Sequence, residues 1–215
     1  MYNPNYFKEK DGAVVLQFIK DHPFAFITGG DADNKPVATQ IPVFIDERNG
    51  KLFLSGHIMK NTDHHKAFVH NSNVLAVFTG PHTYISASWY DEKKQVSTWN
   101  YTSVHAKGKL SFLDDQALLE ILKRTTDHFE NNPSSPANFD ELPPEYVARL
   151  SKAIIAFEIE VDVFDNVFKL SQNRNEKTYN NIITELEKRN DPESARVAEE
   201  MKKRIEQMNA NWQKK

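Results

Sequence analysis

Residues 80–108 read GPHTYISASWYDEKKQVSTWNYTSVHAKG, and this stretch says more about the protein than any other part of the chain. It holds two of the three tryptophans, three tyrosines and two histidines among Ser, Thr and Asn side chains. A strand built only for burial would hide apolar residues and expose charged ones. Aromatic rings with polar ends, placed beside hydroxyl groups, instead suit a flat, partly polar ligand or a close subunit contact.

The chain around this stretch alternates between short strands and turns. We predict strands at Phe24–Gly29, Val37–Asp46, Lys51–Ser55, Asn73–Thr79, Thr83–Trp89, Ser97–Phe112 and Ile155–Val163. Asn49-Gly50 predicts a hairpin turn. Pro42 predicts an edge position or a bulge, because proline cannot donate to a strand ladder.

Helical spacing predicts the remaining elements. They are Glu9–Asp21, Asn61–Asn71, a helix capped by Asp114 with Leu118, Leu122, Thr125 and Phe129 on one face, Glu145–Ser151, and two C-terminal helices, the last beginning at Asp191-Pro192 and carrying Val197, Met201, Ile205 and Met208. Strands joined by short turns, with helices gathered at the ends, favour an α+β fold built on an antiparallel barrel.

Composition limits the class of protein. The chain has 215 residues, no cysteine and a formal net charge of −3. The charge gives no bias toward nucleic acid. The absence of cysteine excludes disulfides and a thiol nucleophile, and it fits a cytoplasmic protein. No run approaches the roughly 20 apolar residues of a membrane helix, so we expect no membrane partner.

Most catalytic motifs are absent. His64 and His65 are adjacent and would diverge by about 100° on a helix, so we predict no metal site there. There is no nucleophile elbow and no glycine-rich phosphate loop. One pattern remains: residues 55–61, SGHIMKN, lie where a strand leads into a helix. Such a junction can bind phosphate, and the alternative is that Asn61 or Thr62 only caps the helix.

Several sequence blocks, in this order, resemble the PaiB-type proteins, also called FMN-binding negative transcriptional regulators. The blocks are MYNPNYF at 1–7, ATQIPV at 38–43, SGHIMKN at 55–61, GPHTYISASWY at 80–90, VSTWNYTSVHAKG at 96–108 and KLSQNR at 169–174. The resemblance implies the split-barrel flavin-binding fold shared with pyridoxamine-phosphate oxidases, with peripheral helices and a helical C-terminus. It also implies a homodimer with flavin mononucleotide (FMN) at the subunit interface.

The resemblance also implies a set of cofactor-binding residues. One block would line the flavin ring, a second would approach the ribityl phosphate, a third would supply aromatic walls near the dimer interface, and a fourth would close the pocket. In that order the residues are Thr39, Gln40, Ile41 and Pro42; His57, Lys60 and Asn61; Trp89, Trp99, Tyr101 and His105; and Lys169, Ser171 and Gln172. For each, the alternative role is packing or capping. No catalytic side chain is expected.

The chain departs from the family pattern at three positions. Ala87 and Ser97 stand where SPSWY and VPTWNY have proline, which loosens the backbone at two points. Lys60 stands where a GHLAR-like block has arginine, which keeps the charge and loses bidentate phosphate recognition. We therefore expect FMN to be held weakly.

The resemblance implies an FMN-binding protein with a negative transcriptional-regulatory role, exerted through flavin redox or sensing. Any enzyme activity would be that of an FMN-dependent oxidoreductase. Alternatives are a dimeric repressor that contacts DNA directly, and a haem-binding protein that uses His57, His82 or His105. The basic residues of the C-terminal helices, Lys202, Lys203, Arg204, Lys214 and Lys215, are interleaved with glutamates and favour a solvated helix over DNA binding. We predict a barrel domain at 1–174 and a helical extension at 175–215.

Overall fold

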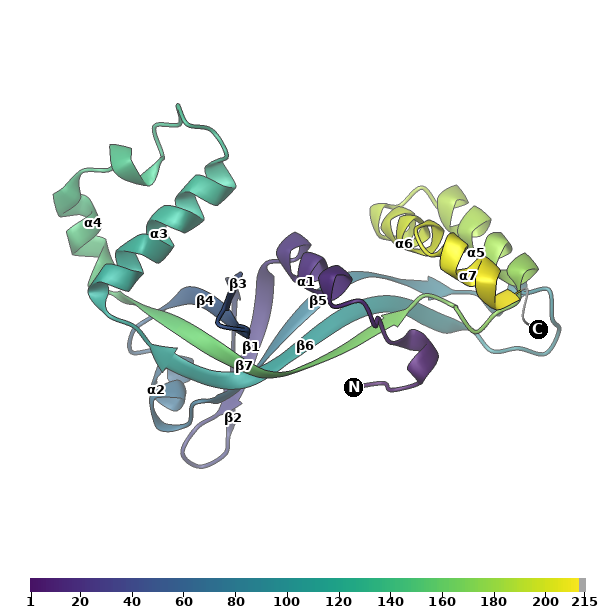
Figure 1. Ribbon diagram of the computed structural model, residues 1–215, viewed down its shortest axis with the longest axis horizontal. Coiled ribbons are helices and arrows are strands. Elements are labelled where there is room, and N and C mark those ends of the chain that lie inside the picture. The colour runs from purple at the N-terminus through teal and green to yellow at the C-terminus, as the bar shows by residue number, and fades with distance from the viewer. Residues whose placement is uncertain (213–215) are drawn as a thin grey trace. The chain divides into compact units, whose positions relative to one another are not determined.

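The computed structural model describes residues 1–212. Its helices are α1 (Gly12–Asp21), α2 (Asp63–His70), α3 (Asp115–Glu130), α4 (Pro144–Ser151), α5 (Glu176–Lys188), α6 (Pro192–Lys202) and α7 (Ile205–Trp212), with short 3-10 turns η1 (Asn5–Phe7), η2 (Ala87–Trp89) and η3 (Phe139–Glu141). Its strands are β1 (Phe24–Gly30), β2 (Pro36–Pro42), β3 (Phe44–Arg48), β4 (Lys51–Met59), β5 (Asn73–Ile85), β6 (Thr98–Phe112) and β7 (Ile154–Lys169) (Figure 1).

The chain divides into two compact units. Unit 1 contains Met1–Phe18, Thr79–Val104 and the chain from Asp165 onward. Unit 2 contains Ile19–Phe78 and His105–Phe164. Strands β5, β6 and β7 pass from one unit into the other, so each of these strands contributes residues to both.

The strands of residues 1–212 form one sheet in the order β2-β1-β5-β6-β7-β4-β3. The pairs β1–β2, β1–β5, β3–β4 and β4–β7 are antiparallel. Strand β2 is at the edge, as the proline at 42 predicts. The hairpin between β3 and β4 is also confirmed: Arg48 pairs with Lys51, and Asn49 and Gly50 between them have φ of 53° and 74°, as a two-residue primed turn requires.

Unit 2 has a core of alternating strand residues. Ala25 and Ile27 of β1, Leu54 of β4, and Phe157 and Ile159 of β7 are all buried. On this sheet Leu118 and Ile121 of α3 pack against Ala156. The predicted cap of α3 is confirmed, because the Asp114 carboxylate accepts the backbone N–H of Ala117 at 2.9 Å.

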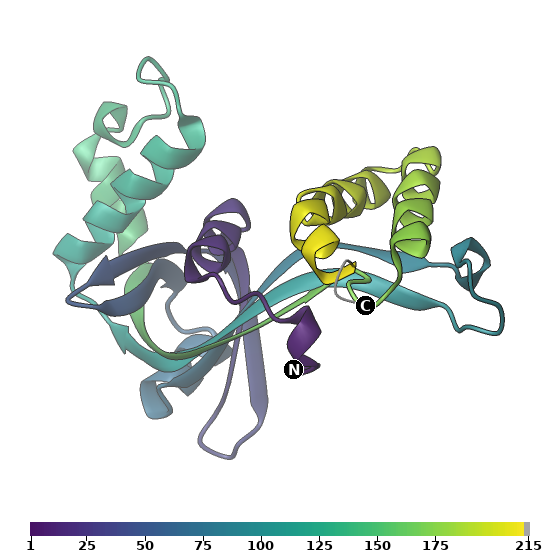
Figure 2. The same cartoon turned by 45° about the vertical axis from the view of Figure 1, so that its right-hand side comes forward.

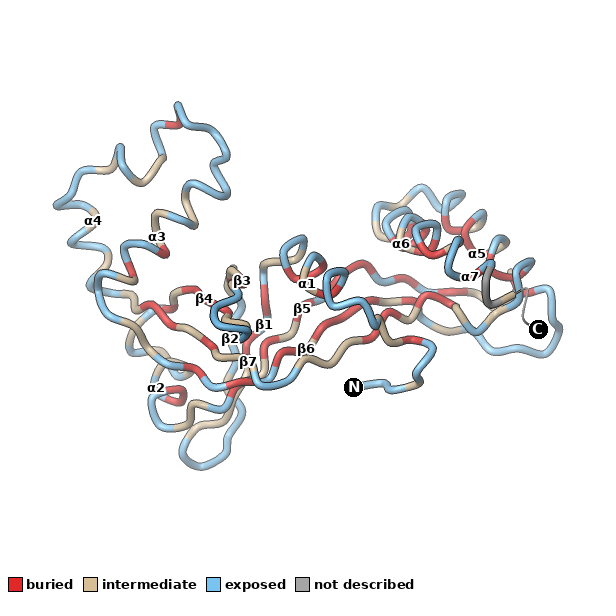
Figure 3. The backbone as a smooth tube through the Cα atoms, in the orientation of Figure 1, coloured by how far each residue is buried: buried red, intermediate tan, exposed pale blue. Residues whose placement is uncertain are grey.

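Unit 1 has a separate core under its C-terminal helices. The apolar faces of α5, α6 and α7 gather over the ends of β5 and β7 (Figure 2). The cluster consists of Ile85, Tyr90, Leu170, Tyr179, Ile182, Ile183, Leu186, Val197, Ala198, Met201 and Met208. At its centre the hydroxyl of Tyr179 donates to the carbonyl of Met201 at 2.9 Å. Buried and more exposed positions alternate along β5 (Figure 3).

Several predicted boundaries differ from the structure. The helix expected from Glu9 begins at Gly12, and the strand expected at 37–46 is two strands, because Val43 leaves the ladder and donates its N–H to the carbonyl of Pro23. Strand β4 continues past Ser55 to Met59, so the first part of SGHIMKN is strand, paired with β7. Strand β5 runs unbroken to Ile85, and Trp89 lies in η2 instead of a separate strand.

The C-terminal region also differs from the prediction. The last helix is divided into α6 and α7, and the bend between them brings the buried guanidinium of Arg204 to 3.1 Å from the Glu9 carboxylate. The face expected on α3 is partly wrong, since Phe129 is exposed and Ile121 is buried. The domain boundary at 174 stays a prediction, and residues 213–215, with Lys214 and Lys215, lie outside the described residues.

Across residues 1–212, no helix combines the length and apolar character that crossing a bilayer requires.

Candidate functional site

Unit 2 contains a cavity of about 260 Å³ between β2, β4 and the start of α2. We call it the β4 cavity; it is lined by Thr39, Ile41, His57, Ile58, Met59, Thr62, His64 and Ile154. Because alternate residues of a strand face the same side, Thr39 and Ile41 reach it together. Three residues that the sequence predicts as cofactor-binding, Thr39, Ile41 and His57, therefore lie in one place.

The start of α2 forms one wall of this cavity. Thr62 is the helix cap: its hydroxyl oxygen accepts the N–H of His65 at 3.3 Å and the hydroxyl donates to the carbonyl of Met59 at 3.0 Å. A ring nitrogen of His64 lies 3.0 Å from the same hydroxyl. Asn61 has a left-handed backbone, with φ of 67°. The capping role left open by the sequence thus belongs to Thr62, which also lines the cavity.

His57 is half-buried in the wall of the β4 cavity. Burial lowers the pKa of its imidazole below 6.5. At neutral pH the ring is therefore uncharged, and it contributes hydrogen-bonding groups without a positive charge. Any attraction of the cavity for an anion must come from elsewhere, such as the partial positive charge at the start of α2.

The other predicted residues of unit 2 lie outside this lining. Gln40 is exposed between Thr39 and Ile41, and Pro42 is half-buried at the end of β2, where its carbonyl oxygen lies close to Gly56. Lys60 lines a different cavity, formed by α3 and α4. His105 is half-buried on β6, and Asn61 is exposed.

Unit 1 carries an open, shallow cavity of about 390 Å³ on β5 and β6. It is lined by Thr79, His82, Trp99, Tyr101, Thr102 and Ser103, which we call the Trp99 face. The Trp99 side chain is prominent there at 52% exposed, with its ring 6.2 Å from His82 and 6.3 Å from Tyr84. The buried hydroxyl of Thr102 has no hydrogen-bond partner among the described residues.

Trp89 has different surroundings. The guanidinium of Arg189 lies 4.5 Å above its ring, and its carbonyl oxygen accepts a hydrogen bond from Asn181 at 3.3 Å. The ring packs against the unit 1 core. These contacts give Trp89 a packing role, which is the alternative that the sequence left open for it.

The KLSQNR block is held by local hydrogen bonds. The Lys169 ammonium donates to the Thr98 hydroxyl and to the carbonyl of Trp99, and Ser171 donates to the Asn100 side chain at 3.0 Å. Gln172 accepts the N–H of Leu170 at 2.7 Å. Burial, followed by the nearby charge of Arg174, lowers the pKa of Lys169. The block therefore fixes the strand that carries Trp99.

Ala87 and Ser97, the two residues that stand where the family pattern has proline, are hydrogen-bonded to each other. The backbone N–H of Ala87 donates to the hydroxyl of Ser97 at 3.0 Å. A proline at 87 would have no N–H to donate, and a proline at 97 would have no hydroxyl to accept. One hydrogen bond thus joins the two positions at which this stretch departs from the expected family pattern.

The sequence did not identify several lining residues. Ile58, Met59, His64 and Ile154 of the β4 cavity belong to this group, as do Thr79, Thr102 and Ser103 of the Trp99 face. The alternation of β5 and β6 could have indicated the second set, because every other residue of a strand shares a face.

Metal binding and DNA binding gain no support from the described residues. They contain no group of three or more His, Cys, Asp or Glu side chains that could hold a metal ion. Within the basic triplet, Lys202 pairs with Glu187, Lys203 with Glu200 at 2.7 Å, and Arg204 with Glu9. The charge of the triplet is therefore offset locally.

Comparisons with known proteins identify relatives of this chain. Residues 1–163 match a family model described as "Putative FMN-binding domain". The "Protease synthase and sporulation protein PAI 2" of Bacillus subtilis is 33% identical over 205 residues, which cover 95% of this chain and 98% of that protein.

Two solved structures show the same fold. The conserved hypothetical protein Rv2991 of Mycobacterium tuberculosis has a TM-score of 0.55 at 9% identity, covering 79% of this chain and 91% of that one. The FAD and heme binding protein of Mycobacterium smegmatis has a TM-score of 0.52 at 17% identity, covering 75% and 72%. The α+β, antiparallel split-barrel fold expected from the sequence is confirmed.

Proposed function

Since this chain belongs to the PaiB-type family of FMN-binding split-barrel proteins, we propose that it holds FMN in the β4 cavity and that a second copy of the chain completes the site. The observation that supports this most strongly is the convergence of Thr39, Ile41 and His57 beside the start of α2. These three residues come from two blocks that the family resemblance connects with the flavin.

The residues of the β4 cavity fit the two ends of FMN. Ile41, Ile58 and Ile154 offer apolar contacts to a flat ring, and β2 is an edge strand whose outward backbone groups can meet ring heteroatoms. Thr62 and the N-terminus of α2 offer hydroxyl and N–H groups to a phosphate. FMN, when bound, would supply the electron-transfer chemistry. The protein's part is to bind and orient it.

Size supports a second copy of the chain at the site. The cavity holds about 260 Å³, whereas sites for ligands of drug size span about 300–1,000 Å³. One chain therefore covers part of the cofactor. Aromatic residues are enriched at protein interfaces, and each unit exposes two of them: Trp99 and Tyr84 in unit 1, and Phe24 and Phe26 in unit 2. Self-association through such rings would give a homodimer.

We extend the proposal to a regulatory role that depends on the flavin. The support is the sequence resemblance to FMN-binding negative transcriptional regulators, together with the 33% identity to the "Protease synthase and sporulation protein PAI 2" of Bacillus subtilis. The local pairing of Lys202, Lys203 and Arg204 favours regulation through flavin state or a protein partner over direct contact of this triplet with DNA. A promoter retardation assay with and without FMN, repeated at two salt concentrations, tests that choice.

FMN titration tests the site. We expect the fluorescence of FMN to be quenched when FMN binds. Riboflavin, which lacks the phosphate, should bind at least about tenfold more weakly. Ile41→Trp fills the β4 cavity and should abolish binding. Ala38→Trp introduces the same indole at an exposed position of β2 and should bind FMN normally. Equal affinity for FMN and riboflavin, or equal binding by the two variants, would contradict the proposal.

A further inference from the structure

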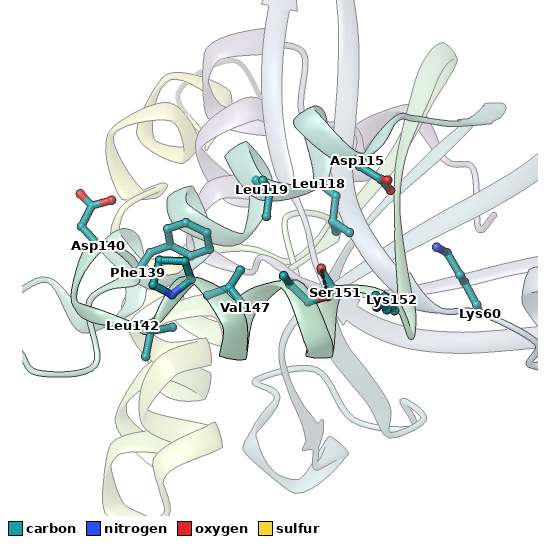
Figure 4. A pocket seen from close by; sticks show the side chains of 12 residues that line it. Lys60, Asp115, Leu118, Leu119, Phe139, Asp140, Leu142, Val147, Ser151 and Lys152 are labelled. Atoms are coloured by element: carbon teal, nitrogen blue, oxygen red, sulfur yellow. Dashed lines mark hydrogen bonds between the residues drawn. The ribbon is translucent and has the colours of Figure 1, made fainter.

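A second cavity of unit 2 lies between α3, η3 and α4, and it holds about 610 Å³. We call it the α3–α4 cavity. Its apolar lining comes from both helices and the segment that joins them: Leu118, Leu119, Phe139, Leu142, Pro144, Val147 and Ala148. In Figure 4 the labelled apolar side chains Leu118, Leu119, Phe139 and Val147 lie between Asp140 and Lys60. The volume is within the range of about 300–1,000 Å³ that is typical for small organic ligands.

The polar residues divide between the two ends. Lys60, Lys152 and Asp115 lie on one side of the view in Figure 4, Asp140 lies on the other, and Ser151 lies between them. A backbone hydrogen bond supports the grouping of Lys60 with Lys152. The N–H of Lys60 donates to the carbonyl of Ala153 at 2.8 Å, and Ala153 is the residue that follows Lys152. Lys60 and the end of α4 are therefore neighbours.

Charge favours an anion at the lysine end. Asp140, at the far end, is paired with Lys123 of α3. Among the ion pairs of residues 1–212, none includes Lys60 or Lys152. The lining at the lysine end thus carries two lysines and one carboxylate, that of Asp115. A ligand with an anionic head and an apolar body would match both the charge and the lining.

We propose that the α3–α4 cavity binds a carboxylate with an extended apolar body, such as a medium-chain fatty acid. Its head lies at Lys60 and Lys152, and its body lies against Leu118 and Val147. The site goes beyond the proposed FMN function and shares no lining residue with the β4 cavity. Met59 lines one cavity and Lys60, the next residue, lines the other.

Calorimetric titration with sodium decanoate tests this proposal. Decanoate should bind. Octanoate should bind about 15-fold more weakly, because it has two fewer methylenes and each buried methylene contributes about fourfold in affinity. Decyltrimethylammonium, which has a cationic head, should bind at least about tenfold more weakly than decanoate. Lys152→Met keeps the apolar stem and should weaken decanoate about tenfold. Lys109→Met removes an exposed lysine of β6 as a matched control and should change nothing. No binding, or equal binding of the cationic amphiphile, would overturn the proposal.

A variant that fills the α3–α4 cavity distinguishes carboxylate binding from flavin binding and from a subunit contact at this cavity. Val147→Trp should abolish decanoate binding, with a thermal melt confirming that it folds, while FMN titration of the same variant stays unchanged. Loss of FMN binding in this variant would assign the cavity to the flavin site. Loss of self-association would assign it to a subunit contact. Either result overturns the proposal, and both are distinguishable from failure of FMN binding in the wild-type chain.

Discussion

Trp89 and Trp99 stand ten residues apart in one sequence motif, and the structure gives them opposite surroundings. Trp89 lies under the Arg189 guanidinium and packs against the unit 1 core. Trp99 is 52% exposed on β6 beside His82 and Tyr84. Each tryptophan follows a hydroxyl side chain, Ser88 or Thr98, so the local sequence does not separate them. A polar aromatic motif can therefore combine residues that stabilise a unit with residues that face a ligand or partner.

The largest expected effect in this comparison is on stability. Trp89→Ala removes a ring packed against the unit 1 core and should lower the free energy of unfolding by about 3 kcal/mol. Trp99→Ala removes an exposed ring and should change it by less than about 1 kcal/mol. Urea denaturation at a protein concentration low enough to keep the chain monomeric measures both. Similar losses of unfolding free energy in the two variants would contradict the different roles assigned to Trp89 and Trp99.

A smaller effect is expected at the hydrogen bond from Ala87 to Ser97, which joins η2 to the segment before β6. Ser97→Ala should cost about 1 kcal/mol, because the Ala87 N–H loses its acceptor. In an Ala87→Pro background the same serine change should cost close to nothing, because no donor is left. A double-mutant cycle by urea denaturation measures the difference, and additive costs would show that the bond contributes nothing.

Local signals predicted much of the fold. Asp114 caps α3, Asn49-Gly50 forms the hairpin turn, and Asp191 caps α6 by accepting the N–H of Ser194 at 2.8 Å. Each of these depends on a few neighbouring residues. Continuity of β5 through Gly80 was missed, because it depends on distant partners: a Cβ at Gly80 would lie 2.3 Å from the hydroxyl oxygen of Thr102. The glycine that looks like a turn signal is a site of close packing.

The sequence predicted only part of the candidate site, because part of it also depends on distant partners. The family blocks named Thr39, Ile41 and His57, and these three residues line one cavity in the structure. Lys60 belongs to the same block as His57, yet it lines the α3–α4 cavity, whose other walls come from residues 115–152. Only tertiary structure brings those residues to Lys60. The division of predicted site residues between units 1 and 2 is likewise set by where β5, β6 and β7 cross from one to the other.

Sedimentation velocity followed in the visible flavin band tests most directly whether FMN binds a cavity completed by a second copy of the chain. The wild-type chain with FMN should sediment as a dimer carrying flavin. Trp99→Ala should weaken self-association about 30-fold and lose flavin with it, whereas Tyr146→Ala, another exposed aromatic, should behave as wild type. Flavin bound at full affinity to a monomer, or a Trp99→Ala dimer with undiminished flavin, would contradict this arrangement.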